Sequence, residues 1–192
     1  RVAFPVFSTI QNDDVKLRVG YLKIIKSIAF LNIPIYVGLF TVAQPLIILL
    51  LGSEWIPAIS VFKILVWLGI LYSLTNPLGS LLLAKGRADL GFWFNIFAIL
   101  VYAIAIYVGS QWGIQGIAWS LVMSCALILL PADFWLRWYL VKMKPLEYMW
   151  SFIPFLAISL VMGSSVSIIN HFFPTDSAAL QLVILGTTGA LI

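Results

Sequence analysis

Charged residues are scarce in this sequence. Only 9% of the 192 residues are Asp, Glu, Lys or Arg, whereas 62% are hydrophobic, and the mean hydropathy is +1.09. Soluble domains carry about 25% charged and about 45–50% apolar residues. A soluble fold of this length needs more polar surface than the sequence offers. The deficit therefore excludes a soluble globular domain and predicts that lipid surrounds most of the chain.

Residues that build disulfides and metal sites are nearly absent. Cys125 is the single cysteine and His171 the single histidine, so an internal disulfide is excluded and His171 is a poor metal ligand candidate. A glycine-rich phosphate loop and a nucleophile–base arrangement are not recognisable either. We expect a protein that is not an enzyme and that has no catalytic residues, cofactor or metal.

Charge-free stretches are long enough to count membrane-spanning helices, each of which needs about 17–25 apolar residues. The stretch 90–132 has no charged residue, suffices for two helices and is divided by a turn signal at 109–113. The alternation of a barrel strand is not present, so the sequence predicts an all-α, polytopic helix bundle. The predicted spans lie near 24–49, 58–83, 90–108, 114–137, 148–170 and from 178 onward, the last one incomplete.

Lysine and arginine gather in alternate connections between these spans. The opposite connections, near 52–55, 109–113 and 171–177, contain neither residue. Basic connections face the cytoplasm, so we expect a multi-pass membrane protein with these connections on the cytoplasmic side. The basic residues in question are Lys16, Arg18, Lys23, Lys26, Lys85, Arg87, Arg137, Lys142 and Lys144.

The sequence begins without a methionine and ends inside an apolar run, so we expect a piece of a longer protein. Residues 1–23 are expected to form the end of a preceding helix and a cytoplasmic loop. Four transmembrane helices are expected in 24–144, and two further ones, the last truncated, in 145–192.

Lys63 is the one basic residue on the non-cytoplasmic side of the predicted bundle. It lies about six residues inside the second span, roughly 9 Å below the interface. A lysine at that depth is unfavourable unless it faces a cavity or pairs with an acid. Lys63 is therefore a candidate cavity cation for an anionic group such as a pyrophosphate or an acidic sugar. The alternative is a lysine whose stem reaches back to the headgroups.

Asp133 lies near the cytoplasmic end of the fourth span, four residues before Arg137. This spacing favours an i,i+4 ion pair at the membrane interface. The alternative is an acid that acts in a gate or in ion coupling.

Asn76, inside the second span, and Arg87, in the connection that follows it, are further candidates. Asn76 precedes Pro77, and proline kinks a helix because it frees a carbonyl, so Asn76 is the best hinge candidate. Arg87 is a candidate contact for a substrate phosphate or, alternatively, a positive-inside anchor, and Asp89 is expected to cap the third span. Other intramembrane prolines and amides are expected to serve mainly packing: Pro34, Pro45, Pro154, Asn32, Gln44 and Asn95.

Three stretches carry a resemblance to a known family. They are RVAFPVFSTIQ at 1–11, LGSEWIPA at 51–58 and NPLGSLLLAKGRAD at 76–89. They resemble the polysaccharide exporter branch of the multidrug/oligosaccharidyl-lipid/polysaccharide flippase superfamily, which includes the Wzx-type flippases. The similarity extends through 112–118, and beyond about residue 145 it is a match of hydropathy alone.

The resemblance implies a two-lobed flippase of 12–14 helices, of which this chain is the C-terminal part. The implied substrate is an oligosaccharide linked to undecaprenyl diphosphate, flipped across the inner membrane for surface polysaccharide synthesis. Implied partners are this lipid-linked oligosaccharide, membrane lipids and a polysaccharide polymerase. Independently of the resemblance, the short basic clusters between long apolar runs argue against nucleic acid as a partner. Lys63, Arg87 and Asn76 are then candidates for the substrate cavity, and Asp133 for a gate or coupling site.

Three other functions remain open. The first is a drug or cation antiporter of the same superfamily, which should carry a carboxylate in its cavity. The second is a membrane-embedded glycosyltransferase or polymerase of polysaccharide assembly, which needs a large catalytic loop. The third is a structural membrane subunit, which should have no polar cavity between its helices.

Overall fold

The computed structural model describes residues 13–172, and every regular element in this range is a helix. The all-α class is therefore confirmed. The elements are α2 (Asp14–Thr41), α3 (Ala43–Leu51), the 3₁₀ turn η1 (Ser53–Trp55), α4 (Ala58–Thr75), α5 (Leu78–Ala84), α6 (Ala88–Ser110), α7 (Gly113–Ser124), the π-helical turn η2 (Cys125–Leu129), α8 (Leu130–Val141), α9 (Pro145–Trp150) and α10 (Ile153–Phe172).

Four helical stretches are long and apolar enough to cross a membrane. They overlap the first four predicted spans, and a shorter apolar helix, Ile153–Val166, overlaps the fifth. The predicted sixth span, from 178 onward, lies outside the described residues. The four stretches are Asp14–Thr41, Ala58–Ala84, Ala88–Ser110 and Gly113–Val141.

α2 starts at Asp14, whereas the sequence placed the first span near residue 24. Asp13 caps this helix, because its carboxylate accepts hydrogen bonds from the N–H groups of Val15 and Lys16. The bond from Lys16 contributes most to holding the pKa of Asp13 below its usual value. The cap makes the stretch before residue 24 helical from Asp14 onward.

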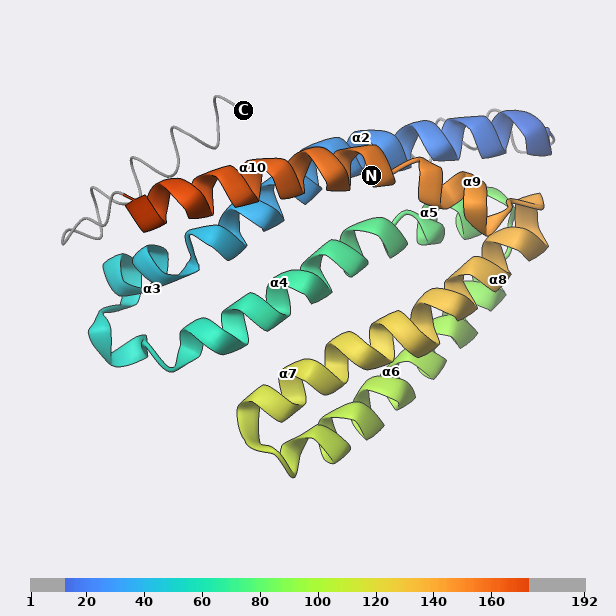
Figure 1. Ribbon diagram of the computed structural model, residues 1–192. Coiled ribbons are helices and arrows are strands. Elements are labelled where there is room, and N and C mark those ends of the chain that lie inside the picture. Colours follow the sequence, from blue (N-terminus) through green and yellow to red (C-terminus); the bar gives the residue numbers. More distant parts are fainter. Residues whose placement is uncertain (1–12, 173–192) are drawn as a thin grey trace.

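The helices run back and forth between two ends of the bundle (Figure 1). The start of α2, the α5–α6 connection and the α8–α9 connection lie at one end, and the α3–α4 and α6–α7 connections lie at the other. The basic connections of the sequence therefore gather at a single end, whereas Lys63 lies in the second turn of α4, near the other. This arrangement agrees with the alternation of basic connections along the sequence.

Buried residues on α2 recur at every fourth position from Leu17 to Val37, with five of the six fully buried. This spacing forms one stripe along the helix, which packs on α4, α8 and α10. A second apolar cluster joins α4 to α7 and includes Ile64, Leu68 and Val122. Near its start α4 therefore packs against α7, and near its end it packs into the cluster that runs along α2.

Glycine permits a close approach of α6 and α7. A Cβ atom on Gly109 would lie 2.7 Å from the carbonyl oxygen of Gly116, so an alanine does not fit there without movement. The hydroxyl of Ser120 donates to the carbonyl of Ala105, at 2.7 Å. Small residues and interhelical hydrogen bonds of this kind are typical of helix pairs in membranes.

Candidate functional site

A cavity of about 650 Å³ lies between α4, α5, α6 and η2. Its wall combines apolar side chains with amide and hydroxyl groups. Within the described part of the chain, no Lys, Arg, His, Asp or Glu lines it. The cavity therefore offers hydrogen-bond donors and acceptors without formal charge. Its polar lining residues are Tyr72, Thr75, Asn76, Asn95 and Tyr102.

Asn76 reaches this cavity because the second span is broken into two helices. α4 ends at Thr75, and Pro77, directly before α5, has no N–H to donate to the preceding turn. Asn76 follows the last residue of α4, and its backbone N–H is bonded to the carbonyl of Tyr72. The structure thus contains a break at the predicted place, and it brings Asn76 to the cavity wall.

An irregular turn forms another part of the wall. η2 is a π-helical turn inside the span Gly113–Val141. Pro131 follows it, and proline cannot continue a regular helix because it lacks an N–H and its ring clashes with the carbonyl four residues earlier. Cys125 and Leu129, at the two ends of η2, line the cavity. The sequence predicts a regular helix over 114–137, and Pro131 is the local signal for the irregular turn that the structure contains there.

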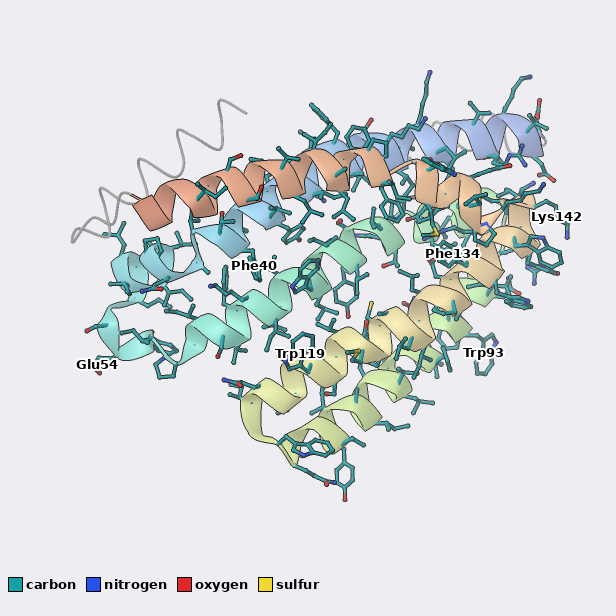
Figure 2. All side chains as sticks on the ribbon, in the orientation of Figure 1. Phe40, Glu54, Trp93, Trp119, Phe134 and Lys142 are labelled. Carbon is teal, nitrogen blue, oxygen red and sulfur yellow. The ribbon has the colours of Figure 1, made fainter. Side chains whose placement is uncertain are left out.

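Asn95 and Tyr102 enter the cavity from α6. They are seven residues apart, which places them two turns apart on one face of the helix. The ring centroid of Tyr102 lies 6.0 Å from that of Tyr72. Trp93 of the same helix is 65% exposed and points away from the other helices (Figure 2). Asn95, expected as an interhelical contact, is therefore a further candidate for the site.

Lys63 lies apart from this cavity. Its ammonium group is 5.4 Å from the ring centroid of Phe40, and the side chain is half-buried. Phe40 lies between α2 and α4 (Figure 2) and meets Trp67 edge-on, with 6.1 Å between the ring centroids. An aromatic face stabilises a nearby cation. The structure thus places Lys63 and Asn76 at different sites.

Arg87 also lies outside the cavity, in the connection between α5 and α6. Its Nε and Nη2 atoms donate to the Asp89 carboxylate at 3.0 and 3.1 Å, and Nη1 donates to the hydroxyl of Tyr139 at 3.4 Å. These contacts favour an anchoring role. The expected cap by Asp89 is wrong: Arg87 is the N-cap residue, and Asp89 lies in the first turn, where its charge complements the helix dipole.

Asp133 and Arg137 form the predicted i,i+4 ion pair on α8. Its surroundings differ from the expectation of an exposed interface, because each side chain is only 1% exposed. Phe134 covers the guanidinium at 5.6 Å. A buried ion pair loses hydration on both partners, so contacts with the surrounding protein must offset that loss.

Two tyrosines complete this buried cluster. The guanidinium carbon of Arg137 lies 4.1 Å from the ring centroid of Tyr148 on α9 and 5.6 Å from that of Tyr21 on α2. The hydroxyl of Tyr148 donates to the carbonyl of Leu74 at 2.7 Å, and Nη2 of Arg137 donates to the same oxygen at 3.4 Å. Neither tyrosine is predicted from the sequence, because these contacts join residues far apart in the chain.

Comparison with known proteins connects these features to a family. Residues 1–60 match a family model described as polysaccharide biosynthesis protein. The whole chain is 32% identical, over 195 aligned residues, to the teichuronic acid biosynthesis protein TuaB of Bacillus subtilis, of which it covers 40%. Over 111 residues, 58% of the chain, it is 40% identical to the lipopolysaccharide biosynthesis protein WzxC of Escherichia coli, of which it covers 23%.

A third relative is an uncharacterized membrane protein in the cps region of Klebsiella pneumoniae. It is 31% identical over 137 residues, which is 71% of this chain and 28% of that protein. No solved structure matches the chain. The chain spans less than half the length of these relatives. The resemblance seen in the sequence is confirmed, because the chain is similar to proteins of polysaccharide biosynthesis. Within residues 13–172 it also carries several helices that are long and apolar enough to span a membrane.

Proposed function

We propose that this chain is part of a transporter that flips lipid-linked oligosaccharide repeat units across the inner membrane for surface polysaccharide synthesis. The names of TuaB and WzxC, which refer to teichuronic acid and lipopolysaccharide biosynthesis, support a polysaccharide pathway. The proposed substrate is an oligosaccharide linked to undecaprenyl diphosphate. In a two-lobed protein, the chain would supply helices of the second lobe.

The observation that carries this proposal is the open, uncharged cavity between α4, α5, α6 and η2, whose largely apolar wall carries amide and hydroxyl groups. A sugar with many hydroxyl groups cannot cross hydrocarbon without hydrogen-bond partners, whereas a polyprenyl tail can stay in the lipid. The amides of Asn76 and Asn95 and the hydroxyl of Tyr72 supply partners of the required kind. Rocking of one lobe against the other then opens such a site to alternate sides.

The cavity favours this substrate over that of a cation antiporter. A cation that leaves water needs oxygen ligands and usually a carboxylate nearby, and the described lining contains no Asp or Glu. The connections in 13–172 are short, which leaves little room there for a catalytic domain. We therefore propose a transporter and not an enzyme, whose product would pass to a polysaccharide polymerase.

Complementation of a strain that lacks the parent gene tests the proposal. Wild-type protein should restore surface polysaccharide and clear accumulated lipid-linked sugars. Asn95→Leu should restore much less at equal protein level, because it removes an amide from the cavity wall. Gln44→Leu is the matched control, since it removes an exposed amide on α3 that does not line the cavity. Equal export by the Asn95 and Gln44 variants would contradict the proposed site.

A further inference from the structure

Two side chains from distant helices converge on one backbone carbonyl. Tyr148 of α9 donates its hydroxyl to the carbonyl of Leu74 at 2.7 Å, and Arg137 of α8 donates Nη2 to the same oxygen at 3.4 Å. Both bonds are buried. Side chains that reach across more than 60 residues to one main-chain atom fix the position of that atom.

The Leu74 carbonyl lies in the last turn of α4, three residues before Pro77. The last four carbonyls of a helix have no partner within it. In an uninterrupted helix the N–H of Leu78 would bond this oxygen. The break at Pro77 leaves the Leu74 carbonyl available for Arg137 and Tyr148.

Arg137 is held in place on several sides. Asp133 pairs with it one turn earlier on α8, and the rings of Tyr21, Phe134 and Tyr148 cover its guanidinium. A buried guanidinium cannot leave this environment without losing charge-assisted contacts that water does not replace there. The donor at the Leu74 carbonyl is therefore rigidly placed.

The carbonyl is directly connected to the candidate site. Thr75 and Asn76, the next two residues of the chain, both line the cavity. We infer that Arg137 and Tyr148 are positioning residues: through the Leu74 carbonyl they fasten α8 and α9 to the break between α4 and α5, and they thereby hold Asn76 in the cavity wall. Their importance for transport rests on the proposed function, whereas their effect on the geometry of the break does not.

Thiol labelling in the full-length protein tests this inference. Asn76→Cys reports on the break, and Gln44→Cys on α3 is the distant control, each in a protein whose other cysteines are replaced by serine. Tyr148→Phe keeps the ring over Arg137 and removes only the hydroxyl. The rate at which a water-soluble maleimide labels position 76 should change by about fivefold, which corresponds to the free energy of one hydrogen bond. The labelling rate at position 44 should stay unchanged.

Pro77→Ala supplies the decisive comparison. An alanine at 77 allows a regular helix in which the N–H of Leu78 takes the Leu74 carbonyl, so Tyr148→Phe should then have little further effect on labelling at 76. Tyr139→Phe, whose hydroxyl contacts Arg87, should be without effect in either background. An unchanged rate at 76, an equal change at 44, or an equal effect of Tyr148→Phe with and without Pro77 would overturn the inference.

The same variants separate this inference from the proposed function. A labelling change at 76 together with normal polysaccharide export would support the positioning of Asn76 and contradict the role of this cavity in transport. An unchanged labelling rate at 76 together with lost export in Asn95→Leu would contradict the positioning of Asn76 and support the role of this cavity in transport.

Discussion

Asp133 and Arg137 lie one turn apart on α8, form an ion pair and are each only 1% exposed. The exposed pair between Asp89 and Arg87 provides an internal contrast, because its side chains are 57% and 39% exposed. The same two chemical groups therefore meet in two very different environments within one chain.

Removal of each carboxylate should have very different effects. Asp133→Ala leaves the Arg137 charge buried without its partner, and we expect a loss of about 3–5 kcal/mol in the free energy of unfolding. Asp89→Ala, the matched control at the exposed pair, should lose about 0–1 kcal/mol. Unfolding of the purified full-length protein in detergent measures both, and similar losses would contradict the burial of the Asp133–Arg137 pair.

Packing of α6 on α7 predicts opposite effects at two glycines. Gly109→Ala places a Cβ 2.7 Å from the carbonyl of Gly116 and should destabilise the protein by about 1–3 kcal/mol. Gly79 lies inside α5 with nothing within 4 Å of an added Cβ, so Gly79→Ala should stabilise it by about 0.5–1 kcal/mol. The same unfolding measurement decides, and equal effects of the two substitutions would rule out the close α6–α7 approach.

Lys63 remains a proposed contact for an anionic group near the non-cytoplasmic end. We expect Lys63→Ala to reduce polysaccharide export, and Lys63→Arg to retain more activity because it keeps the charge. Lys26→Ala, which removes an exposed lysine on α2, should export normally. If Lys63→Ala matches wild type at equal protein level, Lys63 plays no part in the site, and its contact with Phe40 is only structural.

Orientation in the membrane is testable independently of function. Reporter fusions at Gly86 should report the cytoplasm, and fusions at Gln111 the opposite side, because the span Ala88–Ser110 separates them. Reporters that place both positions on one side would exclude the predicted topology.

The sequence revealed the helices well because the constraint that forms them is local. A charge-free run must match the thickness of a bilayer, and the four spans follow from that length alone. The break at Asn76–Pro77 was also visible, because proline acts on its own helix. The capping of α2 by Asp13 escaped notice, although its short acidic side chain before a helix is a local signal as well.

The buried cluster could not be predicted from the sequence. The spacing of Asp133 and Arg137 predicts the pair, but its burial depends on which helices pack around α8. Tyr21 and Tyr148 reach Arg137 only through this packing, and neither belongs to a local motif. For the same reason the sequence singled out Lys63 and Arg87 for their charge, whereas the cavity is lined by Asn76 and uncharged neighbours.

The movement of a lipid-linked oligosaccharide between leaflets tests the central claim most directly. Purified full-length protein in lipid vesicles should move the oligosaccharide head to the opposite leaflet faster than protein-free vesicles do, and the double variant Asn76→Leu, Asn95→Leu should be much slower at equal reconstitution. Movement no faster than in protein-free vesicles would contradict the flippase function, and an unimpaired double variant would contradict the role of the cavity.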